Sequence, residues 1–378
     1  MKLLTLVLFA FLAPLAHAEQ SALPLPPAPT IAAKSYVLTD FHSGQTLVSQ
    51  NANERIEPAS LTKLMTAYLT FAALKQGRLS AEQTLPVSEK AWRTEGSRMF
   101  VEPNKPVTVD QLMHGMIIQS GNDACITLAE AIAGSEETFA QMMNQQAQRL
   151  GMTNTHFVNS TGLPHPQHYT TAHDLSLLAA ALIRDFPEFY PLYSIKEYKY
   201  NNIAQPNRNR LLWLDPYVDG MKTGHTESAG FCLITSARRG SRRLISVVLG
   251  ADSDNARTME SQKLLNYGLQ FFDTVRMYAK NQTVATLPVW KGSEHQLRAG
   301  FKQDMYIAIP RGYYARLKAS MTTTQPLLAP ISAGQRVGTL KLSLDGQPYA
   351  EYALTSLDNV QVGGIFSRTW DGLKLLFK

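Results

Sequence analysis

Two β-rich stretches enclose a long helical middle, and this order constrains the fold more than any other feature of the chain. Residues 35–40 and 45–49 are β-rich around a break at residues 42–44, which predicts a hairpin. Residues 230–237 and 243–250 are again rich in β-branched and apolar side chains. Strands on both sides of a helical middle predict an α+β fold, with helices packed on one antiparallel sheet.

Helical periodicity fills the stretch between these strands. From Ser60, apolar residues recur at helical spacing until a stop near Gly77. Further helices are predicted at residues 123–133, 136–150 and 171–183, and the last begins with Thr171 and Asp174 in the pattern of a capping box. A closing helix is expected at residues 261–278. Residues 31–284 together are predicted to form one domain.

The N-terminus has the three parts of a secretory signal. Lys2 precedes an apolar run, and residues 16–18 (Ala-His-Ala) form a cleavage site, so residues 1–18 are predicted to be removed on export. The alternative is a buried N-terminal helix. A spanning helix is excluded because the run is too short and wrongly flanked. Residues 19–30 are Pro-rich and predict an extended spacer.

The C-terminal part has a different sequence pattern from the helical middle of the chain. Short strands divided by turns predict a small all-β domain at residues 285–358. Residues 359–378 predict an amphipathic helix that inserts into a membrane interface, with docking on the β-domain as the alternative. Its apolar face carries Phe366, Trp370, Leu373 and Phe377, while Arg368, Lys374 and Lys378 lie off that face.

The net charge and the cysteine content limit the classes of protein to which the chain can belong. The formal net charge is +6, or +5 without Lys2, and the basic residues are scattered, so nucleic-acid binding is not expected. An anionic membrane surface or wall polymer suits this mild positive charge. Cys125 and Cys232 either form one disulfide or remain buried thiols. No CxxC or HxxxH spacing is present, so neither a metal nor another cofactor is expected.

A serine and a lysine at the start of a predicted helix form the first chemical motif. Ser60 and Lys63 are three residues apart, so their side chains share a face. Burial and a neighbouring cation would lower the pKa of Lys63 and let it accept the proton of a nucleophilic Ser60. By itself this spacing is common, and a helix-capping serine beside a solvated lysine explains it equally well.

Two further motifs follow at residues 120–122 and 222–224. Ser120 can relay a proton between Lys63 and a leaving amine, and Asn122 can hold a substrate amide. Lys222 adds positive potential, Thr223 offers a hydroxyl to a substrate carboxylate, and Gly224 leaves the strand bare for a peptide.

With these three motifs the chain resembles the low-molecular-mass penicillin-binding proteins, the D-alanyl-D-alanine carboxypeptidases anchored by a C-terminal helix. The likeness extends along essentially the whole chain and includes residues 58–66, 120–124, 207–212 and 218–225. It implies a β-lactamase-like transpeptidase domain. It also implies that backbone N–H groups of Ser60 and His225 form the oxyanion hole, and that Arg257 binds the terminal carboxylate of the substrate. An exposed helix-start arginine is the alternative for Arg257.

Two other functions, a serine β-lactamase and a non-enzymatic wall-binding module, would share some of these features. A serine β-lactamase needs a deacylating Glu, and Glu197 with Asn201 has a similar spacing, but it lies too close to Lys222 in the sequence. The extra β-domain and terminal helix also speak against a β-lactamase. A non-enzymatic wall-binding module would explain the β-domain but not three intact motifs.

The sequence therefore predicts an exported serine D-Ala-D-Ala carboxypeptidase. It is expected on the periplasmic face of a bacterial inner membrane, peripherally anchored, with a role in wall biogenesis and cell shape. Its expected partners are peptidoglycan stem peptides, β-lactams as covalent inhibitors, and the anionic membrane surface. Catalysis is assigned to Ser60, Lys63 and Ser120, and substrate binding to Asn122, Lys222, Thr223, Gly224, His225 and Arg257.

Overall fold

The computed structural model describes residues 27–375. The signal peptide expected at residues 1–18 and most of the spacer expected at residues 19–30 lie outside the described residues. Phe377 and Lys378 of the predicted apolar helix also lie outside them.

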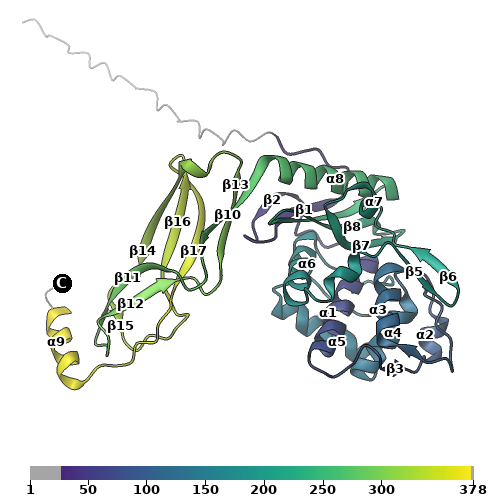
Figure 1. Cartoon of the computed structure of the whole chain (residues 1–378), viewed down its shortest axis with the longest axis horizontal. Helices are drawn as coiled ribbons and strands as arrows, with labels where there is room; N and C mark the ends of the chain where they lie inside the picture. Colours follow the sequence, from purple (N-terminus) through teal and green to yellow (C-terminus); the bar gives the residue numbers. More distant parts are fainter. Residues whose placement is uncertain (1–26, 376–378) are drawn as a thin grey trace, which may run out of the picture.

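A five-stranded antiparallel sheet forms the frame of the larger part of the molecule (Figure 1). The predicted N-terminal hairpin is confirmed, because Tyr36 pairs with Gln50 across its two strands. The first strand also pairs along its other edge with a strand from far downstream, and Tyr36 there faces Val248. The strands, in spatial order, are β2 (Thr46–Gln50), β1 (Ser35–Asp40), β9 (Arg242–Ala251), β8 (Gly230–Arg239) and β7 (Val218–Thr226).

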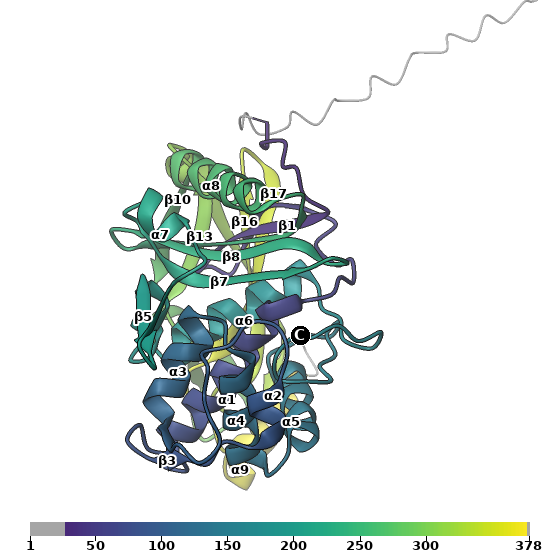
Figure 2. The same cartoon turned by 90° about the vertical axis from the view of Figure 1, so that its right-hand side faces the viewer.

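Both faces of this sheet are covered, which explains its nearly continuous apolar sequence. Side chains alternate between the two sides, so Val37 and Ile234 join the core beneath the sheet, while Leu38 and Leu233 join the core above it. Helix α8 lies along the upper face, and the helical body fills the space below (Figures 1 and 2). The predicted α+β architecture is confirmed.

Four helices of the helical body form where the periodicity predicted them, whereas those at Glu89–Arg93, Val109–Ile118 and Leu211–Leu214 were not predicted. Thr171 caps its last long helix, because the Thr171 side chain accepts a hydrogen bond from the Asp174 N–H at 3.0 Å. The helices are α1 (Lys63–Lys75), α2 (Glu89–Arg93), α3 (Val109–Ile118), α4 (Asn122–Ala133), α5 (Glu136–Arg149), α6 (Ala172–Asp185) and the short α7 (Leu211–Leu214). Two small hairpins pair β3 (Thr84–Leu85) with β4 (Val107–Thr108), and β5 (Glu197–Tyr200) with β6 (Ile203–Pro206).

The helix expected at residues 261–278 is wrong in its second half. Helix α8 spans Asp254–Phe271, and Phe272–Tyr278 forms strand β10 instead, which pairs with β13. The β-branched residues Thr274 and Val275 favour a strand there. Gly268 lets α8 approach the sheet closely, because a Cβ at that position would lie 2.8 Å from Leu38 and 2.6 Å from Leu244.

The β-rich part begins with that strand. The sequence placed a domain boundary between residues 284 and 285, whereas the strands that follow α8 start at Phe272. A six-stranded sheet has the order β14-β16-β17-β12-β11-β15, and β10 and β13 form a separate pair. The strands are β11 (Thr283–Trp290), β12 (Gln296–Gly300), β13 (Met305–Pro310), β14 (Leu317–Thr323), β15 (Leu327–Leu328), β16 (Arg336–Leu344) and β17 (Gln347–Ser356).

A few polar contacts join the two parts at the β1–β2 turn. The Gln45 side-chain oxygen accepts a hydrogen bond from the Ala308 N–H at 2.6 Å, and Arg242 Nε donates to the Thr274 hydroxyl at 3.2 Å. The chain ends in helix α9 (Ile365–Leu375), which lies at the end of the molecule opposite the five-stranded sheet (Figure 1).

Candidate active site

The first motif lies where a tight turn becomes a helix. Ala59–Thr62 forms one turn of 3-10 helix, and α1 begins immediately after it at Lys63. Ser60 is therefore presented from the turn, and Lys63 lies one turn further on the same face. Lys63 is 1% exposed, and its Nζ is 2.9 Å from Ser60 Oγ and also donates a hydrogen bond to the Thr161 carbonyl. The predicted serine–lysine pair is in direct contact.

The second motif occupies the loop between α3 and α4. Ser120 adopts a left-handed backbone conformation, with φ of 61°, which is uncommon for a residue with a Cβ atom. Its hydroxyl accepts a hydrogen bond from Lys222 Nζ at 2.9 Å. Asn122 begins α4, and its side-chain amide donates to the Glu95 carbonyl at 2.7 Å. The sequence expected Ser120 to serve Lys63, but its hydrogen-bond partner is Lys222.

The third motif lies on β7, at the edge of the sheet. Lys222 and Thr223 are buried, and His225 two residues later is exposed. Gly224 was expected to leave room for a peptide. Instead, a Cβ at Gly224 would lie 3.2 Å from the Pro58 carbonyl oxygen and 3.3 Å from Ala59 Cβ. The glycine therefore allows β7 to pack closely against the turn that carries Ser60.

Arg257 is held inside the molecule rather than exposed at the start of a helix. It lies in the first turns of α8 and is only 5% exposed. Its guanidinium donates to the Gly224 carbonyl at 3.0 Å and forms an ion pair with Asp254. Arg257 thus contacts the backbone of the strand that carries the third motif, while its buried Nε has no hydrogen-bond partner among residues 27–375.

Burial of two lysines dominates the electrostatics of the site. Burial lowers the pKa of the Lys63 ammonium to about 8, although Cys125, Asp123 and Glu136 act in the opposite direction. Burial, followed by the nearby charge of Lys63, lowers the pKa of Lys222 well below its ordinary value. Among the nearby charges, that of Arg208 lowers the pKa of Lys63 further, in the direction that the sequence predicted for a neighbouring cation.

A loop that the sequence analysis passed over supports the Lys63 amine. The Asn159 side-chain oxygen accepts hydrogen bonds from the Thr161 and Gly162 N–H groups, at 3.2 and 2.7 Å. Gly162 has φ of 88°, and a Cβ there would lie 1.8 Å from the Ala59 carbonyl oxygen. Only glycine fits this contact. The Asn-Ser-Thr-Gly sequence of residues 159–162 is a turn signal, but nothing local links it to Ser60.

Glu57 is a second contributor that the sequence analysis missed. Its carboxylate accepts a hydrogen bond from the Thr226 hydroxyl at 3.1 Å and another from the Ser228 hydroxyl. Glu57 lies three residues before Ser60, and the two hydroxyls belong to the end of β7 and the turn after it. The contact fixes the nucleophile turn to the segment that carries His225.

His168 supports the same turn from the helical side. The Val158 N–H donates to His168 Nδ1 at 3.2 Å, so that nitrogen carries no proton, and Nε2–H is then the donor to the Thr62 hydroxyl at 2.8 Å. Burial lowers the pKa of His168 to about 4. The neutral ring is therefore the form that fits the fold.

The two cysteines are separate thiols in the structure. Cys125 and Cys232 are both free and buried. Burial raises the pKa of Cys125 to about 12 and that of Cys232 to about 11, which keeps both as neutral thiols. No group of His, Cys, Asp and Glu side chains with the arrangement of a metal site occurs in the described part of the chain.

Taken together, these contacts place two hydroxyls beside two amines with lowered pKa values. Ser60 is paired with Lys63, Ser120 with Lys222, and the edge of β7 runs beside them. Such an arrangement can activate a serine, hold an extended peptide along the strand edge and return a proton to a leaving group.

Replacing His168 by Gln should weaken the pH dependence of stability. Between pH 6.5 and about 4 the unfolded chain binds a proton at this histidine and the folded chain does not, so the free energy of unfolding falls as the pH falls through that window. The loss should reach roughly 3 kcal/mol. Urea unfolding of parent and variant at several pH values measures it. His165→Gln, on the same loop but exposed, should keep the parent's slope, and an unchanged slope in His168→Gln would show that the ring is not held neutral.

The chain was compared with known protein families and with solved structures. Residues 22–253 match the family described as D-alanyl-D-alanine carboxypeptidase, and residues 272–362 match the one described as penicillin-binding protein 5, C-terminal domain. D-alanyl-D-alanine carboxypeptidase DacC from Escherichia coli (strain K12) is 44% identical, with 98% of this chain and 94% of that protein covered.

Two solved structures extend this similarity. Penicillin binding protein 5 from Haemophilus influenzae has a TM-score of 0.85 and 39% identity, covering 89% of this chain and 99% of that one. Penicillin-Binding Protein D2 from Listeria monocytogenes, solved in its ampicillin-bound form, has a TM-score of 0.60 and 32% identity, covering 65% of this chain and 100% of that one.

Proposed function

The chain belongs to the D-alanyl-D-alanine carboxypeptidase family, and on this premise we propose that Ser60 is its nucleophile and Lys63 the base that activates it. It is a serine D-Ala-D-Ala carboxypeptidase and a penicillin-binding protein that acts in peptidoglycan maturation. The observation that carries the assignment of residues is the 2.9 Å contact between Ser60 Oγ and Lys63 Nζ, made by an amine whose pKa burial lowers to about 8.

The first half of the reaction forms an acyl-enzyme. Neutral Lys63 accepts the proton of Ser60 as Oγ attacks the carbonyl carbon of the penultimate D-Ala. The electron pair of that carbonyl moves onto its oxygen, which the backbone N–H groups of Ser60 and His225 bind. When the tetrahedral intermediate collapses, the C–N bond to the terminal D-Ala breaks, and its nitrogen takes up a proton. Water later cleaves the ester, and the stem peptide leaves with a free carboxylate.

We propose that Ser120 and Lys222 supply the proton that the leaving nitrogen takes up, while Lys63 keeps the proton of Ser60. Their 2.9 Å contact gives the Ser120 hydroxyl a partner that can replace its proton as it protonates the leaving nitrogen. The route expected from sequence ran from Lys63 to Ser120, and the structure supports a route in which Lys222 takes part. The lowered pKa of Lys63, about 8, allows this amine to exchange a proton near neutral pH, and burial shifts the pKa of Lys222 in the same direction.

Substrate binding is assigned to the edge of β7 and to the loop opposite it. We propose that the Thr223 hydroxyl and Arg257 bind the terminal carboxylate, with Lys222 adding positive potential. Because the Asn122 amide nitrogen is engaged by Glu95, its oxygen is the atom left to receive a substrate N–H. Gly224 serves this site indirectly, by bringing β7 against the Ser60 turn.

The geometry favours peptide hydrolysis over β-lactam turnover. Glu197, the candidate deacylating residue of the β-lactamase alternative, lies exposed at the start of β5. Its carboxylate makes no hydrogen bond or ion pair within residues 27–375. Asn201 donates to the Phe100 carbonyl at 2.9 Å and lies in the turn of the same hairpin. Neither residue supports deacylation at Ser60.

Penicillin should therefore form a long-lived ester with Ser60. Its strained amide and its carboxylate resemble those of an acyl-D-Ala-D-Ala end, so penicillin should react at the same site. Mass spectrometry of a tryptic digest should find the adduct on the peptide that contains Ser60. Ser60→Ala should lose labelling entirely, while Ser80→Ala, at an exposed serine far from the motifs, should be labelled like the parent. An adduct on another residue would contradict the assignment.

We further propose that the mature protein is exported and attached to an anionic membrane surface through α9. Among the described residues, no helix has both the length and the apolar character to cross a bilayer. Helix α9 turns its apolar side chains outward, with Phe366 93% and Trp370 60% exposed, whereas Asp371 is 6% exposed and accepts a hydrogen bond from the Lys291 N–H at 2.7 Å. Asp371 thus faces the protein while the apolar side chains do not, so docking of the apolar face on the β-rich part is not supported.

Replacing Phe366 and Trp370 together by Ser should release the protein from anionic liposomes. Each large side chain inserted into the interface contributes roughly 1.5–3 kcal/mol, so loss of both should lower partitioning by at least a hundredfold. Flotation of the full chain measures it. Ile203→Ser, at an exposed apolar residue of the β5–β6 hairpin, is the matched control and should float like the parent.

A truncation offers a second arm of this test. Cutting at Thr355 would divide β17, so the chain should instead end at Gly364, after the contacts of Asp358 and Val360 with the β-rich part. This shortened protein should keep its peptidase activity and lose flotation. Equal flotation of all forms would mean that α9 is not the anchor.

A further inference from the structure

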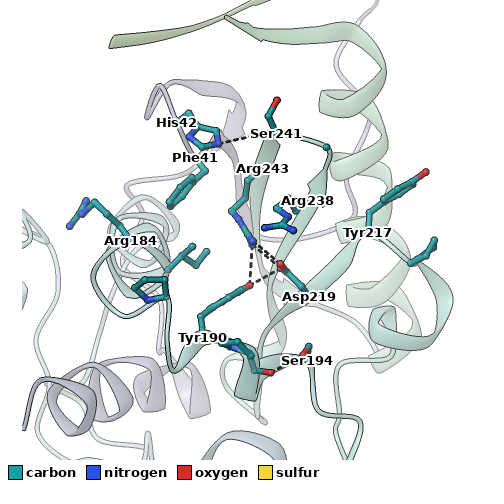
Figure 3. A pocket seen from close by; sticks show the side chains of 15 residues that line it. Phe41, His42, Arg184, Tyr190, Ser194, Tyr217, Asp219, Arg238, Ser241 and Arg243 are labelled. Carbon is teal, nitrogen blue, oxygen red and sulfur yellow. Dashed lines mark hydrogen bonds and ion pairs between the residues drawn. The ribbon is translucent and has the colours of Figure 1, made fainter. Parts of the chain in front are cut away.

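A cavity of about 790 Å³, lined by no residue of the three motifs, lies beside the β1–β2 and β8–β9 turns of the five-stranded sheet (Figure 3). The β1–β2 turn closes it on one side with Phe41 and His42, and the β8–β9 turn closes it on another with Ser241. The segment after α6 and the residues before β7 complete the wall. A space of this volume accommodates a small ligand or a few residues of a peptide.

The floor of this cavity is rigid before any ligand arrives. Arg243 donates two hydrogen bonds to the Asp219 carboxylate, from Nη1 to Oδ1 at 2.8 Å and from Nη2 to Oδ2 at 2.7 Å. The Tyr190 hydroxyl donates to the same carboxylate at 2.8 Å, and all three side chains converge in Figure 3. Arg243 is buried and also donates a hydrogen bond to the Ser236 hydroxyl. These groups satisfy one another, so the floor carries no net charge.

The β8–β9 turn carries more arginines than the carboxylates around it neutralise. Four arginines occur within residues 238–243. Arg243 is neutralised by Asp219, and Arg242 donates to the Gly268 and Leu269 carbonyls at the end of α8. Arg238 and Arg239 are exposed, and neither guanidinium meets a carboxylate anywhere in residues 27–375. Arg238 lines the cavity, and Arg239 lies over the ring of Tyr217, which also lines it.

The walls around Arg238 are largely apolar and stiff. Phe41, Tyr217, Pro187, Pro191 and Pro216 face the space. Such a lining suits a ligand that carries one anionic group on an otherwise apolar body. A polymer with many phosphates would need a continuous track of unpaired cations, whereas the other two arginines that line this cavity are already paired, Arg243 with Asp219 and Arg184 with Asp185.

We propose that this cavity is a second, non-catalytic binding site for the terminal carboxylate of a short apolar peptide, with Arg238 as its anion-binding group. A guanidinium binds a carboxylate through two parallel hydrogen bonds, which gives both affinity and orientation. None of the residues assigned to catalysis lines the cavity, so the proposal goes beyond the assigned reaction.

The position of the cavity links it to the same substrate polymer. Asp219 and Lys222 lie on one strand, β7, roughly 10 Å apart along it. Tyr190 packs directly on this strand, because a Cβ at Gly220 would lie 2.6 Å from its hydroxyl. The enzyme releases peptides that end in a D-Ala carboxylate, and an exposed site of this chemistry close to the motifs would hold one such end while another is cleaved.

The test uses the full chain with its catalytic serine already acylated by penicillin, so that only other sites can bind. The probes are Nα,Nε-diacetyl-L-Lys-D-Ala as the free acid and as its C-terminal amide, titrated by NMR. The acid should bind at least about tenfold more tightly than the amide. Arg238→Gln should reduce the affinity for the acid to that for the amide, while Arg149→Gln, an exposed arginine on α5, should bind like the parent.

Several results would overturn the proposal. They are equal binding of acid and amide, no binding, an unaffected Arg238→Gln variant, or displacement of the peptide by tripolyphosphate at lower concentrations than the peptide itself requires. The last would assign the cavity to phosphate-rich polymers. Thermal melting checks that Arg238→Gln folds, and the Nε–H signal of Arg238 in the parent must shift with the acid and not with the amide.

Discussion

The contact between a buried amine and the Ser60 hydroxyl is the interaction on which the rest of the site depends. An ammonium group in an apolar interior is costly, so burial makes Lys63 a base near neutral pH rather than a permanent cation. Its position needs α1 to begin at Lys63, the Thr161 carbonyl to hold Nζ, and Gly162 to lie against Ala59. Each of these is a backbone feature, and burial outweighs the opposing effect of Asp123 and Glu136 on the pKa of the amine.

The sheet is the frame that brings distant parts of the chain to this amine. Strand β7 packs against the Ser60 turn through Gly224, and Glu57 fixes the turn after β7 to the same segment. Lys222 then reaches Ser120, which is 102 residues away in sequence. Strand β7 is an edge strand of the sheet, which is the position where an extended peptide can add to a sheet. A peptidase of this kind requires a rigid support for its catalytic groups and a strand edge that its substrate can reach.

The sequence predicted much of this arrangement, but it did not predict contacts between groups that lie far apart in the sequence. The hairpin of β1 and β2, helices α1, α4, α5 and α6, and the Ser60–Lys63 contact follow from periodicity and spacing, whereas α2 and α3 were not predicted. The pairing of Ser120 with Lys222, the part played by Arg208 and the Thr161 carbonyl had no local signal, because backbone groups and long side chains meet only in the folded chain. Strand β10 was taken for helix because the apolar pattern of α8 runs on into it.

The most direct test of the account is a titration of the Lys63 amine itself. In protein labelled with ¹⁵N-lysine, the Nζ signal that disappears in Lys63→Arg can be followed with pH in the free enzyme. The account predicts a midpoint at about pH 8, with the acylation rate by penicillin rising through the same pH because the neutral amine is the reactive form. A midpoint near the ordinary lysine value of about 10.4, with acylation already fast at neutral pH, would contradict the assignment of Lys63 as the base.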